Sequence, residues 1–542
     1  MSHPSRRTVL RASLAASGGG LLSSCTGSAG DARSGPQGYG SRRTFVPDGP
    51  RGYVDPSGPE VLAAERARGS GRVRTYRITA AEASLDLGGR TVRTWAYDEA
   101  VPGPLVRASA GEVLDLTLAN RLPALTTLHP HGIRLRCDMD GVPGLTQPPV
   151  RPGTDFRYRF TVAHPGTYLL HSHVGMQSDR ALYAPLVVDD PREPLAYDAE
   201  WIVVLDDWLD GVEGSTPDEV MGRLRPGGAM APGHGAMGAE RPGRGSGGAP
   251  SDRPATGRET AGPSRVLHRS RSRMLHGRAG HVAYPHYLIN GRLPENPSVF
   301  RCRPGDRIRV RIINAGAETA FRVALGDHTM TVTHTDGYPV RPKETDALLV
   351  GMAERYDVLV TAGDGVFPLA AQPEGKRGRA LAVLRTGRRT RALPPVGARP
   401  DELDGRTVPA RRLVPDDSVA LDDREPDREM RIRITGGMED FDWGFDHQAY
   451  SPQRRRPVRA GERVRLTLIN ATDMWHPMHL HGHTFSLTGL DGAGARKDTA
   501  VVLPHRKLVV DLDADNPGLW MLHCHNLYHS ESGMMTVLGY RR

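Results

Sequence analysis

The sequence predicts an all-β protein made of three domains that share one architecture. Its 542 residues exceed the usual size of a single domain and suit three of moderate size. The 63 glycines and 44 prolines stand among short runs of Val, Ile, Leu and Thr, which favours strands joined by turns over long helices. A local pattern that occurs three times along the chain supports the same number of domains.

This repeat is a ten-residue segment that alternates apolar and polar residues between a turn glycine and an asparagine. Its copies are residues 111–120, 305–314 and 461–470. Alternation at period two predicts a half-buried strand. Because the three copies lie well apart, each is expected to belong to its own domain.

Composition and the repeat together divide the chain. We expect a signal at residues 1–25, a flexible spacer at 26–70, a first domain at 71–195, a second at 196–394, a linker at 395–428 and a third at 429–542. Residues of about 221–282 are rich in Gly, Pro, Arg and Ser, which predicts a low-complexity insertion in the second domain. Its Met221, Met230, His234 and Met237 would suit soft copper(I), and low-complexity composition explains them equally.

The N-terminus resembles an export signal. Ser5, Arg6 and Arg7 precede an apolar stretch that ends in a lipobox at Cys25, which predicts twin-arginine export and a lipid anchor on the outer face of the cell membrane. A cleaved signal without lipid is the alternative. No later apolar run is long enough to span a bilayer. In an oxidising compartment Cys137 and Cys302 either pair or remain free thiols, and the sequence leaves both open.

Histidines distinguish the outer copies of the repeat from the middle one. Four His-x-His pairs occur at matching offsets in the outer copies: His129 and His131, His171 and His173, His479 and His481, His523 and His525. The middle copy has Val323, Leu325 and residues 370–372 (Ala-Ala-Gln) at these places. In a strand, residues i and i+2 share a face, so each pair presents two imidazoles together. We therefore expect a metal site shared by the first and third domains, with the middle domain structural.

Cys524 extends this pattern to a second kind of site. Its two flanking histidines face one way and Cys524 faces the other, so a single strand can serve two metal sites. Parity also places His476 on the Cys524 side. Two histidines, one cysteine and a weak axial methionine form a blue-copper centre, which His476, Cys524, His529 and Met534 match.

On these motifs the chain resembles the multicopper oxidases from about residue 75 to residue 542, and among them the actinobacterial copper-tolerance oxidases exported by the twin-arginine route. The motifs are His-Pro-His-Gly at 129–132, His-Ser-His at 171–173, His-Pro-Met-His-Leu-His at 476–481 and His-Cys-His at 523–525. The resemblance implies three cupredoxin-like Greek-key domains. It also implies four copper ions, one of type 1, one of type 2 and two of type 3.

The resemblance assigns each ligand to a copper ion. The implied type 2 ligands are His129 and His479. The implied ligands of one type 3 ion are His131, His171 and His525, and the implied ligands of the other are His173, His481 and His523. Those of type 1 are His476, Cys524, His529 and Met534. The other histidines, including His281, are assigned no role, and His483, which forms a fifth His-x-His with His481, lies outside the repeat.

Two acids are candidates for proton delivery to the cluster. Asp140 occupies the place of an acid in relatives, and a turn aspartate before Gly141 is the alternative reading. Ser530 follows His529 where many relatives carry an acid, and Glu531 is the candidate replacement.

The expected function is that of an enzyme. It takes single electrons from a reductant, namely copper(I), iron(II), phenols or aromatic amines, at the type 1 copper and passes four through Cys524 to O2. The exported layout and the methionine-bearing insertion favour a role in copper tolerance. The alternative is an exported copper-sequestering protein with little turnover. The net charge of +9 is spread along the chain among 62 acidic residues, which argues against nucleic acid as a partner.

Overall fold

A computed structural model describes residues 50–225, 263–387, 392–489 and 492–542. These residues belong to one unit, Phe45–Arg542. The predicted signal with Cys25 lies outside them, as do Met230, His234 and Met237.

Three domains follow one another, and each consists of two β-sheets. In the first domain the strand orders are β2 (Thr91–Tyr97), β1 (Val73–Asp86), β4 (Val113–Asn120), β6 (Asp155–Thr161), and β3 (Val106–Ser109), β8 (Tyr183–Asp189), β7 (Gly166–His171), β5 (His129–His131).

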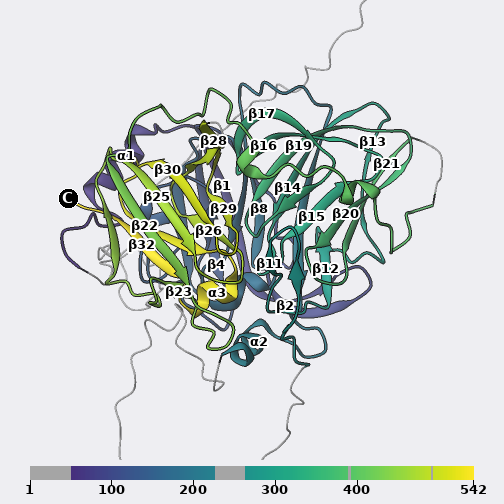
Figure 1. Cartoon of the computed structure of the whole chain (residues 1–542), viewed down its shortest axis with the longest axis horizontal. Coiled ribbons are helices and arrows are strands. Elements are labelled where there is room, and N and C mark those ends of the chain that lie inside the picture. The colour runs from purple at the N-terminus through teal and green to yellow at the C-terminus, as the bar shows by residue number, and fades with distance from the viewer. Residues whose placement is uncertain (1–49, 226–262, 388–391, 490–491) are drawn as a thin grey trace, which may run out of the picture. The chain divides into compact units, whose positions relative to one another are not determined.

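The middle domain has larger sheets, and it lies beside the third domain in Figure 1, coloured teal to green. Its strand orders are β12 (His286–Ile289), β9 (Ala199–Trp208), β14 (Arg307–Asn314), β19 (Arg355–Thr361), β16 (Met330–Thr335), β17 (Tyr338–Thr345), and β13 (Ser298–Cys302), β21 (Ala380–Thr386), β20 (Val366–Pro373), β15 (Phe321–Leu325), β18 (Leu348–Val350). A separate hairpin joins β10 (Arg271–Ser272) to β11 (Gly277–Arg278).

The third domain repeats this plan. Its strand orders are β23 (Gly444–Phe445), β22 (Arg428–Thr435), β25 (Arg463–Asn470), β30 (Lys507–Asp513), β27 (Phe485–Gly489), β28 (Gly492–Lys497), and β24 (Arg455–Val458), β32 (Met535–Tyr540), β31 (Leu519–Cys524), β26 (His476–Leu480), β29 (Thr499–Val502). The only α-helices in the described residues are α1 (Pro59–Ala67), α2 (Pro217–Leu224) and α3 (Leu527–Ser532). The prediction of an all-β fold of three similar domains is confirmed.

The three copies of the sequence repeat occupy the same place in their sheets. β4, β14 and β25 each have a parallel neighbour on one side and an antiparallel neighbour on the other. The asparagine that ends each copy plays the same role in all three, because its buried side-chain amide donates to at least two backbone carbonyls further along the chain. These asparagines are Asn120, Asn314 and Asn470. The amide therefore satisfies backbone groups that a buried loop would otherwise leave without partners.

Strand pairing brings the histidine pairs together within each outer domain. His129 of β5 lies opposite His171 of β7, and His479 of β26 lies opposite His523 of β31. In the middle domain the corresponding pair is Val323 and Ala371. The counterpart of His171 is thus Ala371, one residue later than its spacing from Gly365 indicates, because pairing with β15 fixes the register of β20.

The described structure differs from the sequence-based expectation near both predicted flexible segments. Residues 59–67, expected to lie in a spacer, form α1, which begins at a proline and buries Val61. Met221, expected in the insertion, is buried in the core as part of α2, whose N-cap Thr216 accepts from the Glu219 amide. Leu275 is buried in that core too. Local helix signals and apolar side chains within these segments account for both differences.

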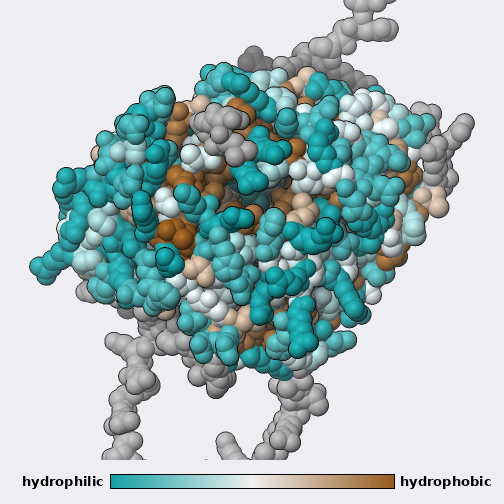
Figure 2. Space-filling view, in the orientation of Figure 1, coloured by the Kyte–Doolittle hydropathy of each residue, from teal (hydrophilic) through white to brown (hydrophobic). Residues whose placement is uncertain are grey.

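The surface seen in Figure 2 is mainly hydrophilic, with hydrophobic side chains confined to small areas and a central hollow. Large hydrophobic side chains that are exposed in the described residues are few and scattered: Val73, Leu105, Leu393, Val396 and Val414. None of the helices in the described part of the chain combines the length and apolar character needed to cross a bilayer.

Candidate functional site

Eight histidines of the first and third domains converge in the interior. They form two groups whose ligand atoms lie within 4.8 Å of one another, and a third that shares one histidine with the first. The first contains His131, His171 and His525, the second His173, His481 and His523, and the third His129, His479 and His131. All are buried except His525, which is partly buried. Strands from two domains thus place three sets of ring nitrogens around a common centre.

Hydrogen bonds fix which nitrogen of each ring faces that centre. The Nδ1 atoms of His129, His171 and His479 lie 2.6, 2.9 and 2.9 Å from the backbone oxygens of Asp140, Ser172 and Asp498. Their Nε2 atoms are buried and have no hydrogen-bond partner among the described residues. A ring that donates from one nitrogen to a carbonyl presents the other as a lone pair, which is the usual arrangement of a metal-bound histidine.

His131 forms its hydrogen bond through Nε2 instead of Nδ1. Its Nε2 lies 3.1 Å from Asp498 Oδ1 and its buried Nδ1 has no partner in the described chain. The carboxylate accepts the Nε2–H and leaves Nδ1 toward the centre. Asp498 belongs to the third domain, so a group of one domain orients a ring of another.

Burial favours the neutral form of eight histidines at the two sites. Removal from water lowers the pKa to about 3 for His171 and His476, and it also lowers the pKa of His131, His479, His481, His523, His525 and His529. A metal binds only a neutral imidazole, so this environment favours the form that can act as a ligand.

A separate group of ligands surrounds Cys524 at the end of β31. Cys524 Sγ lies 3.6 Å from His476 Nδ1 and 3.7 Å from His529 Nδ1, and the two nitrogens lie 3.1 Å apart. Such spacings suit nitrogen and sulfur ligands at about 2.0–2.3 Å from one ion. Burial raises the pKa of the Cys524 thiol, and metal binding would displace its proton. The arrangement fits a mononuclear centre with two histidines and a thiolate.

Met534, the expected axial ligand, is buried next to this group. Its carbonyl accepts the Cys524 amide at 3.1 Å, and its own amide donates to His529 O. These backbone contacts place it beside the centre, and its role as a ligand stays a prediction.

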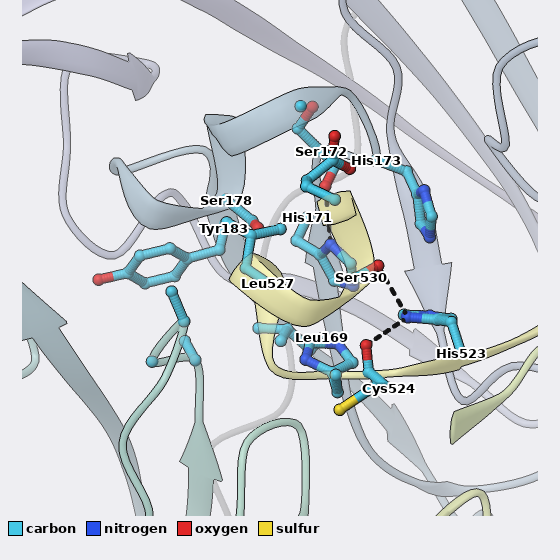
Figure 3. A pocket seen from close by; sticks show the side chains of 16 residues that line it. Leu169, His171, Ser172, His173, Ser178, Tyr183, His523, Cys524, Leu527 and Ser530 are labelled. Atoms are coloured by element: carbon cyan, nitrogen blue, oxygen red, sulfur yellow. Dashed lines mark hydrogen bonds between the residues drawn. The ribbon is translucent and has the colours of Figure 1, made fainter. Parts of the chain in front are cut away.

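β31 joins the two kinds of site. His523 and His525 take part in the three-histidine groups, while Cys524 between them takes part in the mononuclear group. In Figure 3 the Cys524 thiol and the His523 ring leave the backbone in different directions. His523 Nδ1 lies 2.9 Å from Cys524 O, so a hydrogen bond joins a residue of the three-histidine groups to the backbone of the mononuclear group. The predicted division of one strand between two sites is therefore present in the geometry.

A small cavity lies beside the three-histidine groups. It has a volume of about 30 Å³, enough for a water-sized molecule, and His171, His173, His523 and Glu531 are among its lining residues (Figure 3). Ser530 Oγ lies 3.5 Å from His523 Nδ1. Burial raises the pKa of Glu531 to about 7. The cavity thus brings an acid that holds its proton near neutral pH close to the histidines.

Asp140 contacts the cluster directly. Its Oδ2 is 2.8 Å from His481 Nδ1 and its Oδ1 is 3.3 Å from His129 Nδ1, and the carboxyl group is fully buried. Asp140 therefore contacts one histidine from each of the two domains. It is no simple turn aspartate, because its side chain points inward.

Comparison with known proteins agrees with this geometry. Three family models, each describing a multicopper oxidase, match residues 78–193, 268–389 and 423–541. Multicopper oxidase MmcO of Mycobacterium tuberculosis is 47% identical over 480 residues, which cover 88% of this chain and 89% of that protein. This chain belongs to the multicopper oxidases.

More distant relatives share the fold of this multicopper oxidase. Copper resistance protein A of Escherichia coli is 28% identical over 567 residues, covering 85% of this chain and 91% of its own. Among solved structures, Fet3p, a multicopper oxidase that functions in iron import, has a TM-score of 0.69 at 22% identity and covers 86% of this chain and 90% of its own. A laccase from Botrytis aclada has a TM-score of 0.68 at 24% identity, and the match covers 86% of this chain and 88% of the laccase chain.

Because the chain belongs to this family, its cofactor is copper and the protein is an oxidoreductase. The inward-facing nitrogens without partners fit copper, since imidazole and thiolate are ligands that it favours. Cys137 and Cys302 are both free thiols, and Cys137 is buried where its sulfur contacts the backbone of Leu519.

Sequence reasoning missed three residues that support these sites. His281, Arg355 and Asp498 are buried and contact ligands or their partners. No motif marks them, since His281 and Arg355 come from the middle domain, which carries no ligand in the described residues.

Proposed function

We propose that this multicopper oxidase holds four coppers and couples one-electron oxidation of a reductant to the four-electron reduction of O2 to water. The observation that carries the proposal is the position of Cys524 between His523 and His525, one residue in the mononuclear group and two in the three-histidine groups. Bound copper would supply the redox chemistry at both places, accepting single electrons at one and reducing O2 at the other.

The ligands divide into one mononuclear and one trinuclear site. His476, Cys524 and His529, with Met534 as the axial ligand, would hold the type 1 ion. The group of His131, His171 and His525 and the group of His173, His481 and His523 would hold one type 3 ion each. His129 and His479, which share the third group with His131, would hold the type 2 ion, with Nε2 of each as the donor.

The chain's own residues supply what the reaction needs besides metal. The cluster lies inside protein, which excludes bulk water and limits release of partly reduced oxygen. Asp140 and Glu531 approach it from two directions, and each is placed to pass protons to oxygen as it is reduced. Asp140 would act through His129 and His481, and Glu531 through the cavity beside His523.

The reductants we propose are copper(I), iron(II), phenols and aromatic amines, with copper tolerance as the physiological role. The names of relatives support this role, because they include copper resistance protein A, while Fet3p and the laccases indicate a wider range of reductants. Export by the twin-arginine route and a lipid anchor at Cys25 would place the enzyme outside the cell, where it would oxidise copper(I) before entry.

A copper-sequestering protein with little turnover is the second candidate, favoured by the same copper-resistance relatives. Copper per chain and O2 uptake, measured on one preparation with copper(I), iron(II) and a methoxyphenol, separate the two. Four coppers with one O2 consumed per four electrons supports the oxidase. Full copper loading without O2 uptake supports sequestration and contradicts the oxidase.

A further inference from the structure

The ring of His529 has a histidine of the middle domain on its outer side. His529 Nδ1 faces Cys524 Sγ and His476 Nδ1, as described above, whereas its Nε2 lies 2.7 Å from His281 Nε2. Both rings are fully buried. His281 thus contacts a residue of the mononuclear group through the nitrogen that points away from the other ligands.

The geometry determines where the proton between these rings must lie. Two ring nitrogens 2.7 Å apart require one hydrogen between them. If His529 binds copper through Nδ1, its Nε2 carries the hydrogen and donates to His281 Nε2. His281 must then be the tautomer with hydrogen on Nδ1, and it offers a lone pair to His529.

His281 is held in place by the middle domain rather than by the copper site. Its backbone amide donates to Glu318 Oε1, and the neighbouring Val282 amide donates to Glu318 Oε2 at 3.1 Å. Glu318 is itself buried and accepts from Lys376 Nζ at 2.6 Å. This ion pair fixes the backbone at His281, so the histidine has a defined position before any metal binds.

Aromatic side chains enclose the pair of rings. Trp443 stacks on His529 with ring centres 4.2 Å apart, and its centre lies 5.4 Å from that of His281. Phe441 contacts His281 from another side. His281 Nδ1 is buried and has no hydrogen-bond partner among the described residues. A leucine would fill such an apolar place without burying a ring nitrogen that has no partner, so packing alone gives no reason for a histidine here.

We propose that His281 is a positioning residue of the mononuclear copper site, contributed by the domain that carries none of its ligands. By accepting the His529 Nε2–H, it fixes the plane of that ring and increases the electron density on the ligating Nδ1. A more electron-rich ligand stabilises copper(II) over copper(I), so His281 lowers the reduction potential of the site. The inference rests on the proposed type 1 site.

The test is a redox titration of the visible thiolate-to-copper band in the purified copper-loaded enzyme and in His281→Leu. We expect a higher midpoint potential in the variant, and each tenfold change in the relative affinity for the two oxidation states corresponds to about 59 mV. Loss of such an outer partner also weakens metal affinity by about 10- to 100-fold, so competition with a copper chelator should remove this copper more readily.

Two further variants make the result specific. His281→Gln retains an acceptor, but an amide oxygen is a weaker base than an imidazole nitrogen, so its potential should rise less than that of His281→Leu. If the leucine variant does not fold, the glutamine variant decides alone. His328→Leu is the matched control, because His328 is another buried histidine of the middle domain, with ring bonds to Gly326 O and the Gly363 amide. Its potential should equal that of the unmodified enzyme.

An unchanged potential in a folded His281→Leu, or in His281→Gln where it decides alone, overturns the proposal. So does an equal shift in His328→Leu. A failure of the proposed type 1 site would look different. The unmodified enzyme would then bind copper without showing any visible thiolate band.

Discussion

Arg355 Nη1 of the middle domain donates to Asp498 Oδ1 of the third domain at 2.7 Å, and that same oxygen lies 3.1 Å from Nε2 of His131 in the first domain. Arg355 and Asp498 have no exposed side-chain surface. The charged guanidinium holds the pKa of Asp498 well below its ordinary value despite burial. One carboxylate therefore links all three domains at the histidine cluster.

Asp498→Asn tests this link. The substitution leaves Asp336, 3.6 Å away, as the carboxylate paired with Arg355 among the described residues, and breaking a buried ion pair costs about 3–5 kcal/mol of unfolding free energy. Copper affinity of the cluster should fall about 10- to 100-fold, because the His131 ring exchanges a charged acceptor for a neutral one. Thermal unfolding and copper per chain measure the two effects.

The matched control is Asp511→Asn, which breaks an ion pair with Arg465 on a partly exposed face of the third domain. That pair should contribute less than about 1 kcal/mol to the free energy of unfolding, and the copper content of the variant should stay unchanged. Equal losses in both variants would show that Asp498 has no special part in the cluster.

Cys524→Ser should abolish the blue colour and reduce O2 uptake to background. A hydroxyl does not replace the thiolate as a strongly bound ligand, so the connection to His523 and His525 no longer begins at a functioning site. The trinuclear cluster should remain, because none of its ligands has changed. Visible absorption, copper analysis and O2 uptake on one preparation measure all three.

Cys137→Ser is the control for this change. Cys137 is also buried, and its sulfur contacts the Leu519 backbone at 3.2 and 3.3 Å, but it belongs to no metal group. Colour and turnover should persist even if unfolding occurs at a lower temperature. O2 uptake that survived in Cys524→Ser would contradict the proposed route.

Asp140→Asn should slow O2 reduction by about 10²- to 10⁴-fold, the range for loss of a proton-transfer group. An amide retains the size of the carboxyl group beside His481 but does not relay protons. The visible band should not change, since Asp140 does not contact the mononuclear group. Asp138→Asn is the control two residues away, where the carboxylate pairs with Arg136 instead.

Glu531→Gln should also slow O2 reduction, with copper content and the visible band retained. The side chain lines the cavity at His171, His173 and His523, so the loss should affect the reaction of the reduced enzyme with O2. Stopped-flow reoxidation isolates that step. Reoxidation at the normal rate would remove Glu531 from the proton path and leave Asp140 as the single candidate.

The three-domain β architecture could be predicted from the sequence alone, and so could the histidines that gather with one another or with Cys524. The period of two in the repeat and the i, i+2 spacing of the histidines are local properties, and a strand converts them directly into shared faces. Cys524 was recognisable because its sequence neighbours His523 and His525 form one of the histidine pairs, while Cys524 itself faces the opposite side of the strand.

The side chains that surround these residues come from packing between domains, which the sequence pattern does not show. His281 lies 248 residues from His529, and Arg355 lies 143 from Asp498, so no local pattern connects either pair. The described part of the middle domain holds none of the grouped histidines, which supported a purely structural role, yet its packing brings His281 and Arg355 to the two sites. Burial and domain packing set these contacts, and both depend on the whole chain being folded.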